Sequence, residues 1–359
     1  MKQLLKAASG ITLAAMLAAC GSSGGGSSSD QAQEPAENNG TQGEAAYEEL
    51  TITLSHNQPV SSPEHIGAES FKEHIETETD GAITVDIYPA LQLGGLREQV
   101  EATQIGEIDI TLQPSAVVSP FVDDIKVVDL PYLWPADAKA MYEVLDGEAG
   151  QELLGTLEQG GFKGLGFWPG GYKLFTTGEK EIRQPSDFEG ITMRTMESPL
   201  LIEQYKGWGG NAIPVPYAEL YNSLQQGVVD GQENPLQTIF LNNYHEVQSN
   251  IIESYHGTMT YVFMANQMWY DGLSEDAQNV ITEAEAAGKE AAREALTETE
   301  DEYRQQIKDA GVNYYELTAE EIEAFRKASQ PMHKELYSTP EQQERLEKLY
   351  EAIEAATAE

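Results

Sequence analysis

The amino-acid sequence predicts an α/β protein with largely parallel sheets. Segments that alternate apolar and polar residues, as strands do, are separated by segments with helical periodicity, and this order is typical of βαβ units. The chain has 359 residues, of which roughly 310 follow a polar N-terminal stretch. This length is sufficient for two domains.

The first predicted elements follow one another in regular order. Residues 50–54 alternate between apolar and polar side chains, as in a strand with one buried face. The pair Ser62-Pro63 then provides an N-cap and a first helical residue for a helix that ends by Gly81. A second strand is predicted over residues 83–87, and Pro89 stops it because proline cannot donate to a strand ladder.

The same style continues through the rest of the chain. Gly95 leads into a further helix, and residues 108–112 read as a third strand. The sequence from Ser186 to Glu189 has the spacing of a capping box before a strand at residues 191–196. Three more helices are predicted at residues 217–226 with Gly227 as C-cap, at residues 274–310, and after the capping box Thr318-x-x-Glu321.

The first 20 residues predict a lipoprotein signal peptide. Lys2 and Lys6 form a positive n-region, and the apolar segment that follows, at about ten residues, is too short to span a bilayer. The ending Leu17-Ala18-Ala19-Cys20 resembles a bacterial lipobox, whose cysteine is lipidated; an ordinary signal peptide with an incidental cysteine is the alternative. Residues 21–46 read as a flexible tether. We therefore expect an extracytoplasmic protein anchored to the cell membrane by lipid.

Composition excludes several function classes. The formal net charge of −39 excludes nucleic acid and anionic lipid surfaces as partners, because nothing in the chain offsets the phosphate charge. Cys20 is the only cysteine, so its lipidation leaves no thiol for a disulfide, a metal or catalysis. The six histidines are scattered, and no phosphate-binding glycine loop or nucleophile motif is present. The sequence predicts neither an enzyme nor a cofactor or metal; a secreted hydrolase remains an alternative that only a turnover assay would detect.

Two segments have the features of a recognition site. Arg194 ends a predicted strand in a chain with few cations, and its planar guanidinium suits bidentate capture of a carboxylate. Residues 227–235 form a sharp loop after a helix, and Asn234 in this loop has an amide that suits an anion's second oxygen. A surface salt bridge for Arg194 and a structural turn for Asn234 are the alternatives.

A family resemblance adds to this prediction. It is carried by the run Asp230–Pro235, with the sequence Asp-Gly-Gln-Glu-Asn-Pro, and by four other stretches: Tyr88–Gly94, Asp129–Leu133, Phe188–Arg194 and Pro214–Tyr221. Together these stretches resemble the substrate-binding subunit of tripartite ATP-independent periplasmic (TRAP) transporters, of the dicarboxylate-binding (DctP) type. The similarity covers nearly everything after the tether.

The resemblance implies a two-lobed periplasmic-binding-protein-like fold, with a hinge and a long inter-lobe helix. It implies that Arg194 binds the solute carboxylate with Asn234 as its partner. It also implies that Tyr217 packs on the solute and that Asn57 lines the cleft from the first lobe. The lobes are expected at residues 47–169 plus 258–300 and at residues 170–257 plus 301–359.

Two further residues are assigned to the solute site. Many relatives have a second arginine where this chain has Lys173, and a lysine is a point charge that cannot form a fork. A second solute carboxylate would then be held loosely or be absent. Trp168 is a candidate for stacking on the solute, with packing at the hinge as the alternative.

The implied function is binding of a small carboxylate and its delivery to the small and large membrane subunits of a TRAP permease. A C4-dicarboxylate-like solute is the first expectation. A monocarboxylate or an ectoine-like zwitterionic compatible solute is the alternative, motivated by Lys173, Trp168 and the acidic surface. A second alternative is the binding component of an ATP-driven importer.

Overall fold

The computed structural model describes residues 47–358. The predicted signal peptide, the lipobox with Cys20 and the tether at residues 21–46 lie outside these residues. The strands are β1 (Leu50–His56), β2 (Ile83–Tyr88), β3 (Ile110–Pro114), β4 (Phe162–Thr177), β5 (Thr192–Thr195), β6 (Asn211–Pro214), β7 (Gly231–Pro235), β8 (Asn250–Glu253), β9 (Thr258–Asn266) and β10 (Asn313–Glu316).

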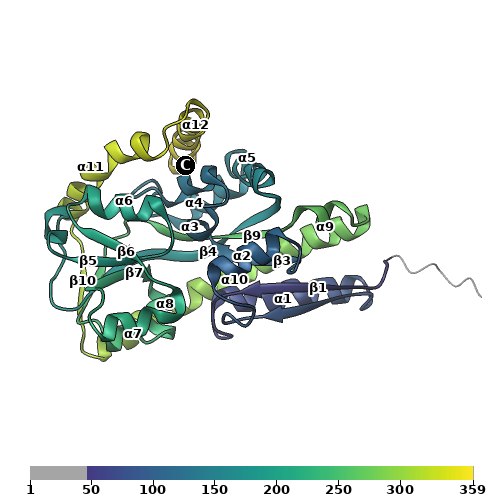
Figure 1. Cartoon of the computed structure of the whole chain (residues 1–359), viewed down its shortest axis with the longest axis horizontal. Coiled ribbons are helices and arrows are strands. Elements are labelled where there is room, and N and C mark those ends of the chain that lie inside the picture. The colour runs from purple at the N-terminus through teal and green to yellow at the C-terminus, as the bar shows by residue number, and fades with distance from the viewer. Residues whose placement is uncertain (1–46, 359) are drawn as a thin grey trace, which may run out of the picture. The chain divides into compact units, whose positions relative to one another are not determined.

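The helices cover the sheet and connect its strands (Figure 1). They are α1 (Pro63–Glu78), α2 (Leu96–Gln104), α3 (Ser115–Val118), α4 (Ala138–Asp146), α5 (Glu148–Gly155), α6 (Pro199–Gly207), α7 (Leu220–Gln225), α8 (Leu236–Leu241), α9 (Gln267–Asp271), α10 (Glu275–Asp309), α11 (Ala319–Leu336) and α12 (Pro340–Thr357).

The strands form two regions joined by two long strands. The hydrogen-bonded order is β2-β1-β3-β9-β4-β7-β5-β6, with β8 and β10 attached beside β4. In Figure 1, β5, β6 and β7 lie at one end of β4, and β1 and β3 lie toward the other. We call the part around β1, β2 and β3 the first lobe, and the part around β5 to β8 and β10 the second lobe. The predicted two-lobed α/β fold is confirmed.

The sheet is mixed, so the expectation of largely parallel sheets holds only within the lobes. The pairs β1–β2, β1–β3, β5–β6, β5–β7 and β8–β10 are parallel. The long strands β4 and β9 pair antiparallel with each other and with their other neighbours. These two strands connect the lobes directly. They are hydrogen-bonded to the strands beside them in both lobes.

Buried side chains form a core for each lobe. One cluster includes Ile52, Leu112 and Phe263 beneath the first lobe. The second lobe has two clusters, one on each face of its sheet: Phe175 belongs to one, and its neighbour Leu174 to the other. Adjacent strand residues point to opposite faces, so β4 contributes to both cores at once.

The long helix α10 is held against α1 by a close backbone approach. A Cβ on Gly288 would come 2.7 Å from the Gly67 carbonyl oxygen and 2.7 Å from the Trp168 ring. Only glycine fits at this point of contact, because any larger residue would push the two helices apart. α10 also packs on β4 and α8, so it spans both lobes as the resemblance implies.

Most predicted elements are present with small shifts at their ends. The helix predicted at residues 274–310 is α10, with Ser274 as its N-cap, and the Thr318–Glu321 capping box is present at α11. The predicted capping box at Ser186 and Glu189 is wrong. The structure forms it two residues earlier, between Gln184 and Asp187 at the start of a short 3₁₀ helix.

The residue bounds predicted for the two lobes stay predictions. The packing of α12 bears on where the second boundary lies. This helix packs on α4 and α5, and its residues Leu346 and Leu349 belong to the same buried cluster as the core of the first lobe.

Candidate functional site

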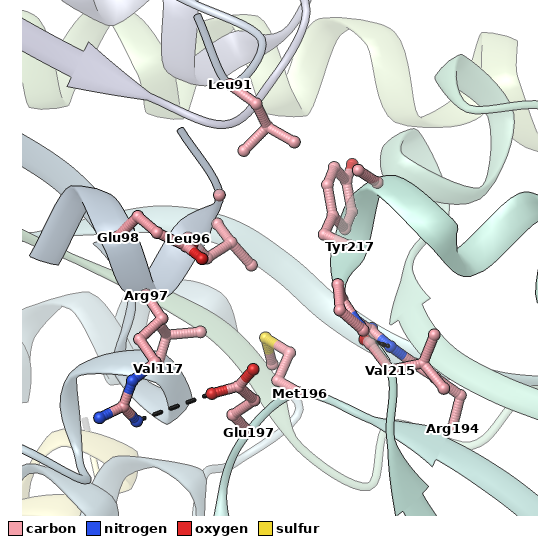
Figure 2. A pocket seen from close by; sticks show the side chains of 13 residues that line it. Leu91, Leu96, Arg97, Glu98, Val117, Arg194, Met196, Glu197, Val215 and Tyr217 are labelled. Atoms are coloured by element: carbon pink, nitrogen blue, oxygen red, sulfur yellow. Dashed lines mark hydrogen bonds and ion pairs between the residues drawn. The ribbon is translucent and has the colours of Figure 1, made fainter. Parts of the chain in front are cut away.

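A small cavity lies between the two lobes, next to Arg194 (Figure 2). Its volume of about 80 Å³ is several times the roughly 10–15 Å³ that one ordered water needs. The start of α2 and Leu91 line it from the first lobe; the end of β5 and the loop after β6 line it from the second. We call it the Arg194 cavity, and its lining is Leu91, Gly95, Leu96, Arg97, Glu98, Val117, Arg194, Met196, Glu197, Val215, Pro216, Tyr217 and Ala218.

Arg194 is buried in this wall without an anionic partner. It lies on β5 between Ile213 of β6 and Gln232 of β7, and its side chain is 2% exposed. Its Nε donates to the Val215 carbonyl oxygen over 2.9 Å. Within residues 47–358, its two terminal nitrogens donate no hydrogen bond and no carboxylate pairs with it. The free edge of the guanidinium is therefore available for an anion.

The electrostatics of Arg194 are those of a buried charge that favours an anionic partner. Burial lowers the pKa of Arg194, while Tyr244, Tyr217 and Glu233 act in the opposite direction. Arginine still keeps its proton in proteins, so the cavity wall carries a positive charge. A buried charge is costly unless it is paired and hydrogen-bonded, and an incoming carboxylate supplies both.

Tyr217 and Asn57 lie at a second, adjoining cavity. The two cavities share Leu91, Tyr217 and Ala218. The Tyr217 hydroxyl donates to Gln58 Oε1 over 3.3 Å and so links the lobes. Asn57 is buried, and its Oδ1 has no partner in the described residues. The structure therefore brings Arg194, Tyr217 and Asn57 to one connected space between the lobes.

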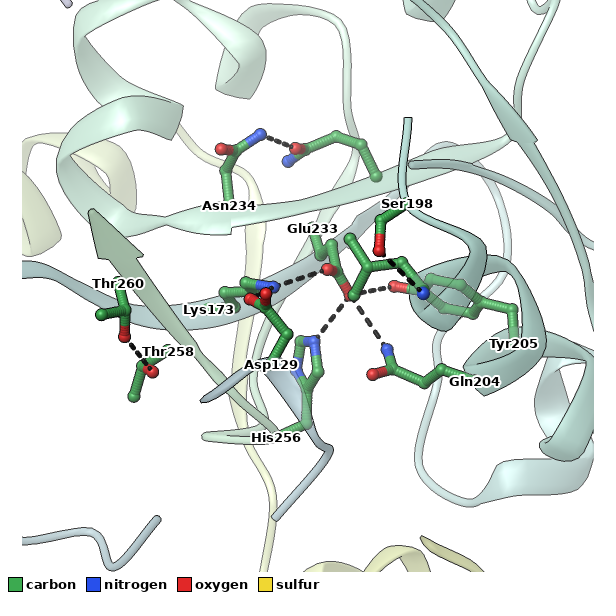
Figure 3. A network of polar contacts seen from close by, with 12 residues as sticks. Asp129, Lys173, Ser198, Gln204, Tyr205, Glu233, Asn234, His256, Thr258 and Thr260 are labelled. Carbon is green, nitrogen blue, oxygen red and sulfur yellow. Dashed lines mark hydrogen bonds and ion pairs between the residues drawn. The ribbon is translucent and has the colours of Figure 1, made fainter. Parts of the chain in front are cut away.

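Asn234 lies close to Arg194 in the sheet but outside the lining of the Arg194 cavity. It is buried on β7, two residues after the Gln232 that pairs with Arg194. Its Nδ2 donates to the Gln232 side chain (Figure 3). In this conformation one N–H of its amide is engaged within the second lobe.

Lys173 belongs to a separate buried network around Glu233 (Figure 3). Its Nζ lies 3.0 Å from Glu233 Oε1 and 3.7 Å from Asp129 Oδ1, and the side chain is 1% exposed. The other Glu233 oxygen accepts from His256, Tyr205 and Gln204 at 2.9, 2.7 and 3.2 Å. Lys173, which the resemblance assigns to the solute site, is therefore paired with the carboxylates of Glu233 and Asp129.

The charges of this network are set by burial and pairing together. Burial disfavours the charge of Lys173, but Glu233 and Asp129 outweigh that effect and raise the pKa of Lys173. Burial likewise opposes the charge of Glu233, yet Lys173 and His256 hold the pKa of Glu233 well below its ordinary value. For Asp129, burial wins over the attraction of Lys173 and raises its pKa to about 6. The tight ion pair is therefore that of Lys173 with Glu233.

Trp168 packs inside the first lobe rather than at the cavity. Its indole N–H donates to Glu285 Oε1 over 2.9 Å, and its ring stacks on Phe263 with a centroid separation of 4.8 Å. Its ring also fills the space between Gly67 and Gly288. These contacts agree with the packing alternative considered for this residue.

Several residues of the site were not singled out from the sequence. Gln58 bridges the lobes, because its amide donates to Tyr261 over 2.7 Å and accepts from Tyr217. Its place beside Asn57 in the same loop was the available signal. Ala90 and Leu91 have φ values of 51° and 63°, a strained conformation for residues other than glycine that is often found at functional sites. No local pattern indicates that strain.

Arg97 and Glu197 form an ion pair across the Arg194 cavity (Figure 2). Arg97 Nη1 lies 3.6 Å from Glu197 Oε2, and both side chains are 44% exposed. Arg97 also pairs with Glu101 on its own helix at 2.9 Å. The pair joins α2 of the first lobe to the end of β5 in the second, and at this exposure it contributes little to stability.

Glu64 forms a buried contact between the lobes near Tyr217. It is 0% exposed at the start of α1, its Oε1 accepts from Gln237 Nε2 of α8 over 3.0 Å, and its Oε2 has no partner in the described residues. Burial raises the pKa of Glu64 to about 7, although hydrogen bonds to its backbone, Ser62 and Gln237 oppose the shift. This carboxyl is therefore largely protonated below neutral pH.

We expect this glutamate to make stability fall as pH rises. Its folded-state pKa of about 7 lies above that of an unfolded glutamate, so its contribution is complete below the unfolded pKa and is lost as pH rises toward 7. The loss is roughly 3 kcal/mol, at 1.36 kcal/mol per pKa unit. In urea unfolding between pH 5 and pH 8, the free energy of unfolding should therefore fall less with rising pH in Glu64→Gln than in the wild type. Glu73→Gln, on the same helix, is the control; an unchanged slope in Glu64→Gln would contradict the assignment.

Two lobes around an interlobe cavity, with a buried unpaired arginine in the cavity wall, define the class of hinged solute-binding proteins. The family model described as bacterial extracellular solute-binding protein, family 7 (DctP) matches residues 54–339. The chain belongs to this family, and the resemblance to TRAP substrate-binding subunits is confirmed.

Individual relatives agree with the family. The C4-dicarboxylate-binding periplasmic protein DctP of Rhodobacter capsulatus is 35% identical over 88% of this chain and 93% of its own. The ectoine-binding periplasmic protein TeaA of Halomonas elongata is 32% identical over 88% of this chain and 93% of its own. The crystal structure of a TRAP periplasmic solute-binding protein from Desulfovibrio salexigens with bound orotic acid has a TM-score of 0.82 at 31% identity, over 85% of this chain and 99% of that chain.

Family membership bears on two further expectations. The family consists of extracytoplasmic transport proteins that bind solutes, rather than of enzymes. It belongs with TRAP permeases, which disfavours the ATP-driven importer considered above. In the described part of the chain, no helix combines the length and the apolar character needed to cross a membrane.

Proposed function

We propose that this protein captures a small carboxylate in the interlobe cavity and delivers it to the small and large membrane subunits of a TRAP permease. The observation that carries the proposal is the buried Arg194, which lines the cavity and whose terminal nitrogens donate no hydrogen bond within residues 47–358. A carboxylate bound there accepts two parallel hydrogen bonds from a guanidinium that cannot lose its charge.

The relatives support this choice of ligand chemistry. C4-dicarboxylates, ectoine and orotic acid, the ligands named for three relatives, differ in size and in charge at their far end. All of them carry at least one carboxylate. A site built around one buried arginine fits this shared carboxylate. The other residues of the cavity then contact the rest of the solute and determine which solute is bound.

Binding is coupled to closure of the lobes in this proposal. Tyr217 and Arg194 come from the second lobe, and Asn57 and Leu91 from the first. A solute that contacts both sides favours the closed state by the difference between its affinities for the closed and open states. The permease then receives the closed form.

We further propose that the mature protein is held at the outer face of the cell membrane through a lipid on Cys20, which becomes the N-terminus after removal of residues 1–19. The lipobox-like run Leu17–Cys20 and the polar stretch 21–46 support this. Mass spectrometry of the intact mature N-terminus would detect the added diacylglycerol. An unmodified N-terminus upstream or downstream of Cys20 would reject the anchor.

Native mass spectrometry of the purified protein tests the ligand class. We expect a bound small molecule that contains a carboxylate, is released on unfolding, and keeps its mass during incubation because the protein does not convert it. Rebinding is expected to give a saturable calorimetric signal. A co-purified solute without any acidic group, or one that is chemically converted by the protein, would contradict the proposal.

A further inference from the structure

The charges around the two cavities restrict what the far end of the solute can be. The linings of the Arg194 cavity and the adjoining Asn57 cavity contain two cations, Arg97 and Arg194, and two anions, Glu98 and Glu197. Arg97 is already paired with Glu101 and Glu197, and Lys173 is buried against Glu233. Arg194 is thus the one cation in these linings that is free to hold a carboxylate.

The first-lobe side of the Arg194 cavity is unsuited to a second carboxylate. The N-terminus of α2 faces this space through Gly95, Leu96 and Glu98, and a helix N-terminus ordinarily attracts an anion. A side chain on Gly95 would collide with the Glu98 carboxylate, so this carboxylate already lies over the start of the helix. A second solute carboxylate would meet Glu98 and Glu197 instead of a free donor.

Apart from Tyr217, the uncharged side chains that line the Arg194 cavity are apolar. They include Leu91, Leu96, Val117 and Met196, and Figure 2 shows Leu91 and Met196 directed into the space between the lobes. Leu91 is held there by the left-handed backbone at residues 90–91. Strain of this kind persists only where the surrounding structure enforces it, so the position of the Leu91 side chain is a defined feature of the site.

We propose that the solute is a monocarboxylate with an uncharged, largely apolar body. Its carboxylate binds Arg194, and Leu91 and Met196 select the body. This inference rests on the proposed function and narrows its ligand class. It departs from the C4-dicarboxylate-like solute that the sequence resemblance implies first, because the second cation of the cavity linings, Arg97, is already paired with Glu101 and Glu197.

Three four-carbon acids test the inference by changing only the far end. Butyrate ends in a methyl group, succinate in a carboxylate, and 4-aminobutyrate in an ammonium group. After removal of any co-purified solute by reversible unfolding, calorimetry should show butyrate binding about tenfold or more tighter than the other two.

Two variants connect this preference to the residues named. Glu98→Gln removes an anion from the cavity wall and should narrow the ratio of butyrate to succinate affinity; Glu344→Gln on the exposed face of α12 is the matched control. Leu91→Asn keeps a residue that tolerates the left-handed backbone but makes the wall polar. It should weaken butyrate binding more than succinate binding.

The outcomes separate this inference from the proposed function. Tighter binding of succinate that is lost in Arg194→Lys would overturn the monocarboxylate assignment and leave the carboxylate site standing. Tighter binding of 4-aminobutyrate that is lost in the same variant would overturn the assignment of an uncharged body, and the carboxylate site would again stand. Equal affinities for the three acids would also overturn the monocarboxylate assignment. Binding of none of them at millimolar concentration would contradict the carboxylate site itself.

Discussion

Arg194→Lys is expected to weaken carboxylate binding by about tenfold or more, at least about 1.4 kcal/mol, while the fold is kept. The lysine ammonium keeps the charge but cannot present two parallel N–H donors. It also cannot donate to the Val215 carbonyl oxygen while it reaches the cavity, whereas Arg194 has Nε for this contact and leaves its terminal nitrogens free. The lysine variant therefore loses both the fixed orientation of the cation and its two parallel N–H donors.

Calorimetry with the co-purified solute measures this effect, and far-UV circular dichroism with urea unfolding checks the fold. Arg326→Lys is a matched control, because Arg326 is exposed and pairs only loosely with Glu323 at 3.5 Å. The control should bind as the wild type does. If Arg194→Lys bound the solute with unchanged affinity, Arg194 would not be the carboxylate ligand.

Lys173→Met is expected to lower the free energy of unfolding by about 3–5 kcal/mol, because it leaves a buried carboxylate without its cation. Glu233 is 2% exposed and loses the partner at 3.0 Å that keeps it ionised. Solute affinity should change far less than stability, since the lysine is bound to Glu233 and Asp129 rather than facing the cavity. Urea unfolding and calorimetry on the same preparation measure the two effects.

Two further variants check the cause. The double variant Lys173→Met/Glu233→Gln removes both charges, so part of the lost stability should return. Lys327→Met removes an exposed lysine that pairs with Glu323 at 3.7 Å and should change the free energy of unfolding by less than about 0.5 kcal/mol. If Lys173→Met instead weakened solute binding and left stability unchanged, Lys173 would belong to the solute site, as the resemblance first suggested.

The candidate site was predictable where one residue type has one dominant chemistry. An arginine at a strand end in a chain with 21 cations and 60 acidic residues pointed to anion capture, and Arg194 lines the interlobe cavity. Lys173 and Trp168 follow a different logic. Their types suit a ligand, but their surroundings decide their use, and those surroundings come from Glu233 and Glu285, which are 60 and 117 residues away in the chain.

The sequence by itself determined the class of fold, most of its helices, and the arginine around which the site is built. Those features depend on local alternation, capping residues and the chemistry of single side chains, which are all properties of neighbouring residues. Only the tertiary structure decided that β4 and β9 run antiparallel between the lobes, that Gln58 bridges the lobes, that Leu91 lines the cavity, and that Lys173 pairs with Glu233 away from it. Each of these depends on which distant groups share a buried space, because burial and pairing set the free energy of a charge or a strained backbone.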